Sequence, residues 1–387
     1  MKLHTFIICL TLLALQGCQS THYSAAQLPK GIYLDNAFQD NVTLESADDI
    51  FYVSPEMKRY VHKRLHPLKT AKEKSTQLIR DLFDPNMMNI GYSHNANFAA
   101  ADTFEKGIAN CMSLTLLSYV LIKEAGLDAK FMDVQLEENW SLQNGRTMLN
   151  GHVNLKVTEK QSPIDLILYA QAYTIDFQPM LGVPVMSQTV LTKDEIIALY
   201  YNNKGGEALA LGDVDLAYQY FKAGSQLAPT KTAIWNNLAS LYRQTGFLAE
   251  AEQIYMYSMH LEPHNLNLKE NLALLYKKSG RTELAKKLQK EVSDKRIKNP
   301  YYHAMLAEEA LYHGKFSASL NHYKKAIALN NKEHRFYFGL ARTYLNLGRY
   351  DNVQKSLQKA KRLADAIQDK RRYQSKISAL ATLSASL

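Results

Sequence analysis

The sequence predicts a chain in two parts, an α+β domain followed by an all-α solenoid of helix pairs. In the C-terminal half, glycines recur every 34 residues between apolar helical stretches, at Gly212, Gly246, Gly280, Gly314 and Gly348. In the N-terminal half, one strongly apolar helical stretch is followed by short segments that alternate polar and apolar residues. Such alternation is typical of half-buried strands, whereas the regular glycine spacing indicates a repeated helical unit.

The 34-residue interval is the tetratricopeptide period. Small residues that let two helices approach closely recur with the glycines, at Ala217, Ala251, Ala285 and Ser319, with Val353 as the exception. The repeat over 232–265 matches the pattern best. We therefore predict five repeats over 198–367 and a closing helix over 368–387. Because no single helix pair can bury its apolar face, the units must stack and form a curved inner surface.

That inner surface predicts a protein or peptide partner. By analogy with other tetratricopeptide grooves it would include Asn236, Arg243, Lys277 and Arg342, which suit an acidic or carboxylate-bearing peptide. The alternative is that these four residues are only exposed helix positions.

Composition limits the other partners. The chain has 387 residues, 46% of them hydrophobic and 21% charged, so it is globular and long enough for two domains. Its formal charge of +9 suits an acidic partner such as an anionic membrane surface. No basic run is interleaved with aromatic residues, so we expect no nucleic-acid binding. The basic stretch over 355–372 is better explained as a solvated helix face.

The first residues predict export and a lipid anchor. A short charged start precedes an apolar run over 6–15, which is too short to span a membrane. The run ends in Leu15-Gln-Gly-Cys18, which resembles the lipobox of bacterial lipoproteins. The resemblance implies a signal peptide over 1–17, cleavage after Gly17, lipid on Cys18 and a polar, lipidated tether over 18–50. Gln19 resembles the pattern that directs lipoproteins to the outer membrane of Gram-negative cells, facing the periplasm. An ordinary secretory signal is the alternative.

Cysteine usage leaves one thiol to explain. The chain has three cysteines. Cys9 would leave with the signal peptide and Cys18 would carry lipid, so Cys111 could form no intramolecular disulfide. A lone thiol in an oxidising compartment is a liability unless it is buried or used. Cys111 is therefore either a small buried hydrophobe or a functional group.

The surroundings of Cys111 favour a functional thiol. Asn110 is a preferred N-cap residue, and Gly126 is placed to end the helix that begins at Cys111. An apolar stripe puts Cys111 on the buried face of the first turn; it consists of Leu114, Leu117, Leu121, Ile122 and Ala125. At a helix start the dipole and the unpaired amides favour the nucleophilic thiolate and can hold an oxyanion.

Two predicted strands supply the groups that a thiol nucleophile needs. His152 begins an alternating stretch over 151–157, and Asp176 lies in a short strand over 173–177. An imidazole can take and return the thiol proton, and a carboxylate can hold the imidazole ring. Cys111, His152 and Asp176 could therefore form one site.

These residues resemble the transglutaminase-like superfamily, which has a papain-like fold. The resemblance rests on Thr103–Cys111, the helix end at Ala125–Ala129, the His152 strand and Ile175-Asp-Phe177. It implies a transglutaminase-like domain over 51–190, with a short Pro-containing linker over 178–192 before the repeats. The whole chain also looks like lipoproteins that join such a domain to tetratricopeptide repeats.

The resemblance also implies residue roles. Cys111 would be the acyl-forming nucleophile, His152 the general base and acid, and Asp176 the group that orients the ring. Asp165 is a weaker candidate for that orienting role, and His94 and Tyr92 could line the cleft. The family often has glycine beside the cysteine and tryptophan after it; here Gly107 lies four residues upstream and Met112 follows. We see no acidic cluster like the calcium loops of animal cross-linking enzymes, so we expect no metal and no cofactor.

Three functions remain open at this point. The first is a periplasm-facing thiol enzyme that hydrolyses an amide or transfers its acyl group. The second is a scaffold with an inactive transglutaminase-like domain. The third is a structural adaptor in which Cys111 is only part of the core. The repeats fit the first two equally well.

Overall fold

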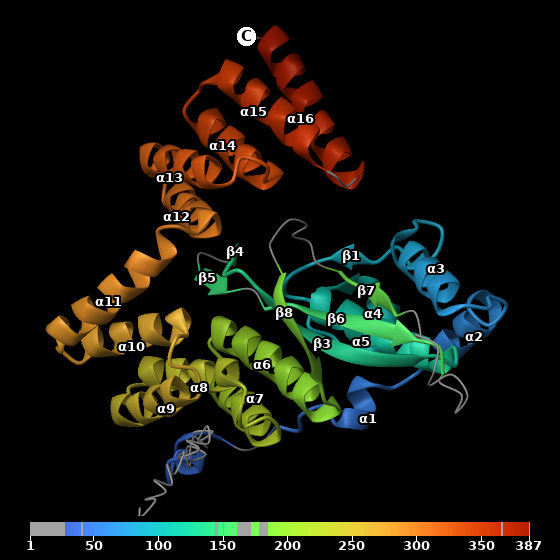
Figure 1. Ribbon diagram of the computed structural model, residues 1–387, viewed down its shortest axis with the longest axis horizontal. Helices are drawn as coiled ribbons and strands as arrows, with labels where there is room; N and C mark the ends of the chain where they lie inside the picture. The colour runs from blue at the N-terminus through green and yellow to red at the C-terminus, as the bar shows by residue number, and fades with distance from the viewer. Residues whose placement is uncertain are drawn as a thin grey trace, which may run out of the picture.

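The computed structural model describes residues 28–39, 42–143, 146–149, 151–160, 172–177, 185–364 and 367–386. Within these ranges the chain forms an α+β unit followed by a helical solenoid, as the sequence predicts (Figure 1). No helix in this part of the chain is both long enough and apolar enough to cross a membrane.

The α+β unit combines short helices with a four-stranded antiparallel sheet of strand order β7-β6-β3-β8. After η1 (Asp35–Ala37), which precedes the unit, its elements are α1 (Ala47–Ile50), α2 (Pro55–Arg64), α3 (Ala71–Phe83), β1 (Gly91–Tyr92), α4 (Ala100–Lys106), β2 (Ile108–Ala109), α5 (Cys111–Glu124), β3 (Asp128–Leu136), β4 (Trp140–Gln143), β5 (Arg146–Leu149), β6 (Val153–Thr158), β7 (Tyr173–Ile175) and β8 (Val185–Leu191). Strands β1 and β2 form a parallel pair just before α5. Strands β4 and β5 form a separate hairpin between β3 and β6.

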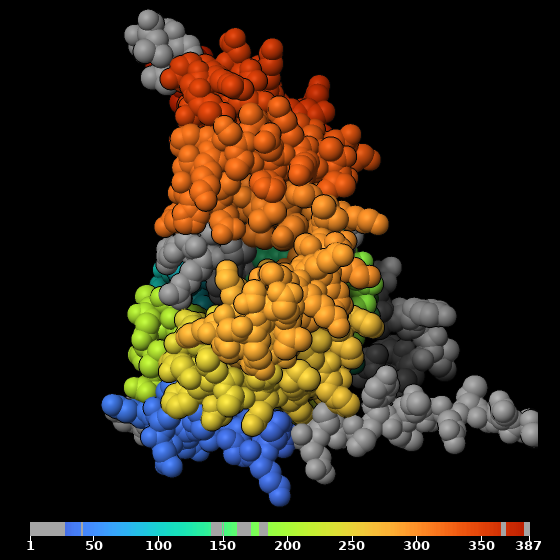
Figure 2. Space-filling model, turned by 90° about the vertical axis from the view of Figure 1, so that its left-hand side faces the viewer, coloured from blue at the N-terminus to red at the C-terminus, as the bar shows by residue number. Residues whose placement is uncertain are grey.

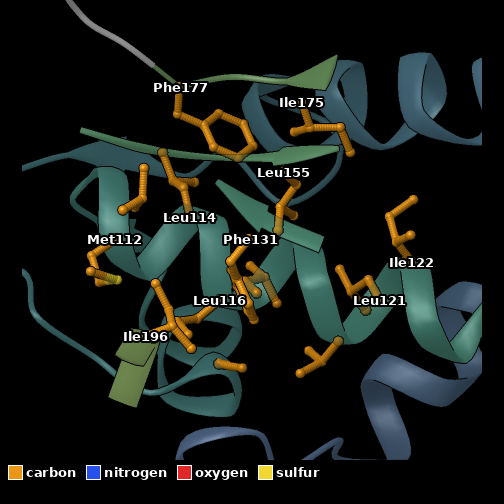
Figure 3. Close-up of a cluster of buried hydrophobic side chains, with 14 of the residues drawn as sticks. Met112, Leu114, Leu116, Leu121, Ile122, Phe131, Leu155, Ile175, Phe177 and Ile196 are labelled. Carbon is orange, nitrogen blue, oxygen red and sulfur yellow. The ribbon is translucent and has the colours of Figure 1, made fainter. Parts of the chain in front are cut away.

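Helix α5 is the centre of this unit. It packs on the sheet through residues such as Leu116 and Leu121, which meet Phe131 and Leu155 in one buried cluster (Figure 3). Helices α2 and α3 also contact α5, so most of its surface is covered. This explains why the α5 sequence is apolar nearly all round rather than along one stripe. The cluster continues into the next helix through Ile196.

Part of the predicted linker is a strand. Residues Val185–Leu191 form β8, which pairs antiparallel with β3 at the edge of the sheet. The stretch contains Val185, Thr189, Val190 and Leu191, and β-branched residues of this kind favour strands. The expectation of a linker over 178–192 was therefore wrong for this part, because a free strand edge of β3 was available to pair with it.

The solenoid consists of five helix pairs and a further C-terminal helix. These are α6 (Lys193–Leu211), α7 (Val214–Leu227), α8 (Thr232–Thr245), α9 (Leu248–Leu261), α10 (Leu266–Lys278), α11 (Thr282–Arg296), α12 (Pro300–Tyr312), α13 (Phe316–Leu329), α14 (His334–Asn346), α15 (Tyr350–Leu363) and α16 (Ile367–Ser386). Each recurrent glycine lies between the two helices of a pair with a φ of 68 to 99°. Glycine adopts this left-handed conformation without the steric cost that a Cβ atom brings, which explains its regular recurrence.

The solenoid does not have one continuous core. Residues of α6 and α7, including Tyr200 and Tyr220, share the core of the α+β unit. The first three repeats form a second cluster, and the last two form a third together with α16. Leu136 and Trp140 of the α+β unit pack against that third cluster. The α+β unit is therefore built into the solenoid at both of its halves.

A segment before the α+β unit is also bound to the solenoid. We call residues 31–39 the strap. Its Ile32 and Phe38 are buried in the cluster of the first three repeats, and the segment lies against those repeats in the space-filling view (Figure 2). The expectation of a polar tether over 18–50 was therefore wrong for this stretch, because its apolar side chains find a surface to cover them.

Candidate active site

Cys111 is the first residue of α5, and the preceding chain is turned sharply to place it there. Gly107 ends α4 with a φ of 62°, and β2 then pairs with β1 so that Tyr92 stands opposite Ala109. Asn110 caps α5, since its Oδ1 accepts a hydrogen bond of 2.9 Å from the Ser113 backbone N–H. Gly107, four residues before Cys111, thus ends α4 in the left-handed backbone conformation that glycine favours.

A buried polar network holds this first turn of α5. The Asn110 side-chain amide donates to Asn97 Oδ1 and to the His94 carbonyl. Ser113 Oγ donates to the Ala96 carbonyl at 2.7 Å and accepts from the Phe98 N–H at 2.8 Å. Because these groups are satisfied by one another, the loop over 94–98 and the start of α5 form one rigid piece.

His152 and Asp176 come together from two neighbouring strands. His152 directly precedes β6, and its side chain is buried. Asp176 directly follows β7, and its Oδ1 lies 2.7 Å from His152 Nε2. The Val134 N–H of β3 donates to the His152 carbonyl at 3.0 Å, which fixes the backbone as well.

Two contacts around this pair were missed in the sequence. Asn154 Nδ2 donates to Asp176 Oδ2 at 3.0 Å, so both carboxylate oxygens are engaged. Thr115 Oγ1 donates to the Cys111 carbonyl at 2.8 Å and lies 3.5 Å from the Val153 carbonyl, so it ties α5 to β6. Asn154 could have been found, since residues two apart on a strand share a face. Nothing in the sequence pairs Thr115 with Val153.

The electrostatics of the site favour a charged imidazole. Burial opposes a charge on the ring, but hydrogen bonds with Asp176 and with the Cys111 thiol outweigh it and raise the pKa of His152 to about 9. Because Nε2 faces Asp176, Nδ1 is the nitrogen left for the thiol. The order thiol, imidazole, carboxylate suits transfer of the thiol proton to a ring that stays oriented.

Tyr92 lies next to Cys111, and His94 lies next to Tyr92. Burial and the neighbouring Cys111 raise the pKa of Tyr92, so its hydroxyl stays protonated. The same hydroxyl lies beside the Cys111 backbone N–H. The His94 ring meets the Tyr92 ring edge-on at 5.1 Å, and burial lowers the pKa of His94. That Tyr92 and His94 line a cleft stays a prediction.

The solenoid braces the strand that holds His152. Lys231, before α8, lies 3.0 Å from Asp133 on β3, whose register partner on β6 is Val153. Farther along, the Arg296 guanidinium at the end of α11 contacts both carboxylate oxygens of Glu138, at 2.7 and 2.8 Å. These two contacts lie on either side of Val134, the residue that binds the His152 carbonyl.

The cysteine side of the site is braced as well. Asn97, which accepts the hydrogen bond from Asn110, donates through its own amide to Glu207 Oε2 of α6 at 3.2 Å. The solenoid thus contacts the supports of both Cys111 and His152.

The predicted groove residues have varied surroundings. Asn236 is buried, and its Oδ1 accepts from Asn271 Nδ2 at 3.0 Å between successive repeats. Arg342 pairs with Glu308 at 2.9 Å. Arg243 is half-buried and Lys277 is exposed. Their role in peptide binding stays a prediction.

Two further predicted residues cannot be placed. Cys18 and Asp165 lie outside the described residues. Among the residues that the structure does describe, no group of three or more His, Cys, Asp or Glu side chains is arranged to hold a metal ion.

Comparison with known families supports the repeats. Residues 334–366, which span α14 and α15, match the tetratricopeptide repeat family. None of the curated proteins matches the chain. The C-terminal region therefore contains a tetratricopeptide repeat, and its helix pairs form a solenoid of that kind.

Solved structures of low similarity were also found. The Cut9–Hcn1 hetero-tetramer of the APC/C is 18% identical over 48% of this chain, with a TM-score of 0.27, and the match spans only 37% of that chain. YrrB, described as a tetratricopeptide-repeat protein with an unusual peptide-binding site, is 12% identical over 46% of this chain and 92% of its own, with a TM-score of 0.25. Pseudomonas aeruginosa PilF is 17% identical over 50% of this chain and 94% of its own, with a TM-score of 0.27.

Proposed function

We propose that the protein is a membrane-anchored envelope thiol enzyme, an amide or peptide hydrolase or acyl transferase that works through an acyl-cysteine. Its α+β unit is transglutaminase-like, with a papain-like fold, and its repeats bind a protein or peptide. The observation that carries this proposal is the ordered contact of Cys111, His152 and Asp176, with the ring 2.7 Å from the carboxylate.

The reaction begins with a proton transfer inside this set. Cys111 gives its thiol proton to His152, and the sulfur attacks the carbonyl carbon of an amide. The oxyanion that forms accepts hydrogen bonds from backbone N–H groups at the start of α5. His152 then returns the proton to the leaving amine as the C–N bond breaks, which leaves an acyl-cysteine.

The acyl-cysteine is resolved by the same groups. Water or a second amine attacks the acyl carbon, and His152 takes its proton. The sulfur leaves, and His152 gives the proton back to it. Asp176 holds the ring in one orientation through both halves of the reaction, which is the task that a carboxylate performs in such a triad.

Alkylation of Cys111 tests the thiol–imidazole pair. The purified full chain is treated with iodoacetamide at pH 7, and mass spectrometry locates the label. We expect Cys111 to react, and to react about tenfold more slowly in His152→Ala, because general-base assistance is lost. His66→Ala is the matched control, since this histidine of the same unit is exposed and its ring contacts His62 and the Glu124 carbonyl rather than the candidate site. Reaction of Cys111 only after denaturation would overturn the enzyme proposal.

The substrate can be identified by trapping the acyl-enzyme. The full chain is incubated with envelope extract, quenched in acid and digested. We expect a mass adduct on the Cys111 peptide, and none in Cys111→Ala. The mass of the adduct distinguishes a protein fragment from a peptidoglycan peptide.

A scaffold with an inactive α+β unit is the second candidate. The observation that favours it is the Tyr92 hydroxyl, which lies beside the Cys111 N–H that an oxyanion would need. In that case Cys111 stays unlabelled in the native protein, while chemical cross-linking in envelope extracts still captures partners of the repeats. These two results together would replace the enzyme by the scaffold.

The anchor and the location are part of the proposal. The lipobox-like Leu15–Cys18 supports lipid on Cys18 and an outer-membrane position facing the periplasm of a Gram-negative cell. Growth with a radioactive fatty acid should label the wild type and leave Cys18→Ser unlabelled. An unlabelled wild type would rule out the anchor.

A further inference from the structure

The strap binds repeats one and two as a peptide ligand would. The Tyr242 hydroxyl of α8 donates to the Ile32 carbonyl at 2.8 Å and accepts from the Leu34 N–H at 3.2 Å. One tyrosine thus binds the backbone of the segment at two points. Recognition through backbone groups tolerates different side chains at the bound residues.

The strap also supplies a carboxylate and an aromatic ring. Asp35 Oδ1 accepts from Tyr218 Oη and from Lys222 Nζ, both at 2.7 Å. The Tyr33 ring stacks on Trp235 with ring centroids 6.2 Å apart. An aromatic residue followed two positions later by an acidic one is therefore the pattern that this surface binds.

Three of the positions that hold the strap recur three repeats later. In the 34-residue register, Trp235 corresponds to Tyr337, Tyr242 to Tyr344 and Lys222 to Lys324, whereas Tyr218, the other partner of Asp35, corresponds to Leu320. Tyr257 of α9, which packs against Trp235, corresponds to Lys359. The aromatic platform, the backbone-binding tyrosine and the carboxylate-binding lysine thus keep their chemistry on α13, α14 and α15. A second lysine replaces the tyrosine of α9.

This second surface is open. A shallow groove of about 260 Å³ lies between α14 and α15; Tyr337, Tyr344, Lys355 and Lys359 are among its lining residues, and Lys324 of α13 lies outside it. Tyr344 is 8% exposed, whereas Tyr242, which the strap covers, is 0% exposed. Tyr337 and Tyr344, which correspond to the strap contacts Trp235 and Tyr242, therefore border this groove. Lys359, which corresponds to Tyr257, borders it as well.

The first of the two register positions between these surfaces is closed by the solenoid itself. One repeat after Tyr242 stands Tyr276, and the guanidinium of Arg281 lies 4.3 Å from its ring. Arg281 also pairs with Glu252 at 2.7 Å, and Glu252 occupies the position of Tyr218. An ion pair thus takes the place that a peptide takes in the first two repeats.

We propose that the surface of α13, α14 and α15 binds an extended partner peptide in which an aromatic residue is followed two positions later by a carboxylate. The peptide lies as the strap lies on α7, α8 and α9, with its backbone on Tyr344 and its carboxylate on Lys324. Lys355 and Lys359 add positive charge that favours an acidic segment. This inference rests on the peptide-binding part of the proposed function and is independent of the thiol chemistry.

A peptide copied from the strap provides the probe. A fluorescent peptide of residues 30–39 is titrated with the full chain, whose own strap occupies the first surface, and binding is followed by fluorescence anisotropy. We expect saturable binding that weakens about tenfold in Lys324→Glu, because a charge-assisted hydrogen bond is lost. A peptide with lysine in place of the aspartate should lose affinity similarly.

The matched control is Lys325→Glu, which makes the same charge change at the next residue of α13, where the corresponding residue Ala223 makes no polar contact with the strap. We expect this variant to bind the added peptide as the wild type does. Tyr344→Phe keeps the ring and removes the hydroxyl, so it should weaken binding without unfolding α14. Circular dichroism checks that each variant is folded.

Two results would overturn the inference. One is the absence of saturable binding. The other is equal binding by Lys325→Glu and Lys324→Glu, which would mean that the peptide carboxylate does not lie on Lys324. Capture of envelope partners by cross-linking would still support a binding solenoid in either case, and Cys111 labelling tests the enzyme separately.

Discussion

Arg296 and Glu138 form a two-pronged ion pair between the solenoid and the α+β unit, with N–O distances of 2.7 and 2.8 Å. The arginine side chain is 1% exposed, lies 2.7 Å from Glu270 and stacks on Trp140 at 5.0 Å. A buried guanidinium that loses its carboxylate partners destabilises the folded state, so this ion pair holds the two units together. Glu138 lies two residues after β3, and Val134 of β3 donates a hydrogen bond to the His152 carbonyl.

Removal of the Arg296–Glu138 ion pair should destabilise the protein. We expect Arg296→Met to lower the free energy of unfolding by about 3 kcal/mol, because two carboxylates lose their partner in a half-buried place. Arg342→Met is the control, since its ion pair with Glu308 is exposed and should be worth less than about 1 kcal/mol. Urea unfolding measures both variants. Equal losses of unfolding free energy in the two variants would show that Arg296 contributes no more than an exposed ion pair.

The His152 pair predicts a pH dependence of stability. Its pKa is raised to about 9, so the folded state binds a proton more tightly than the unfolded state does. The stabilisation is therefore complete below about pH 6.5, the ordinary pKa of histidine, and is lost as the pH rises through 9. Its size is on the order of 3 kcal/mol.

Comparison with a variant isolates this effect. The stability difference between wild type and His152→Gln, measured by urea unfolding from pH 6 to pH 10, should shrink across that window. A stability difference that stays constant would contradict a raised pKa of His152. A difference that grows with pH would mean that folding lowers this pKa.

Gly339 in α14 is required by close packing. A Cβ atom at this position would lie 2.1 Å from the ring of Tyr323, which is 1% exposed. We expect Gly339→Ala to cost about 2 kcal/mol, since the buried ring has to shift. An added Cβ at Gly206 in α6 meets nothing within 4 Å, so Gly206→Ala should stabilise by up to about 1 kcal/mol. Thermal unfolding that ranks the two variants the other way would contradict this packing argument.

Phe38 should hold the strap in place. Its ring stacks on Tyr218 at 4.3 Å and lies 6.0 Å from Tyr242. We expect Phe38→Ala to cost about 3 kcal/mol and to make the strap sensitive to limited proteolysis. Leu28→Ala, at a residue that is 38% exposed, is the control and should change neither property. A protected strap in Phe38→Ala would mean that its polar contacts suffice.

The helical repeats could be predicted from the sequence because their signals are local. The glycines at 34-residue spacing mark positions that need a positive φ, and the residues between them repeat the same packing pattern. The N-cap at Asn110 is likewise a contact within one helical turn, to Ser113. Such interactions are encoded by neighbours in the chain, so their pattern can be read without a three-dimensional arrangement.

The candidate site could be predicted only in part. Cys111, His152 and Asp176 were chosen for their residue types and order, and the 2.7 Å contact of His152 with Asp176 depends on how β6 pairs with β7. Asn154 was missed although it lies two residues after His152 and shares its face of the strand. Thr115 was missed because its contact with the Val153 carbonyl depends on how α5 packs on β6.

The sequence by itself determined the helix pairs, the order of the α+β unit and the solenoid, and the residue types at a candidate thiol site. Only the tertiary structure decided that the strap lies on repeats one and two, that β8 completes the sheet, and that Arg296 reaches Glu138. These contacts join residues far apart in the chain. They depend on the shape and charge of surfaces that exist only after the local elements have packed, and no periodicity in the sequence records them.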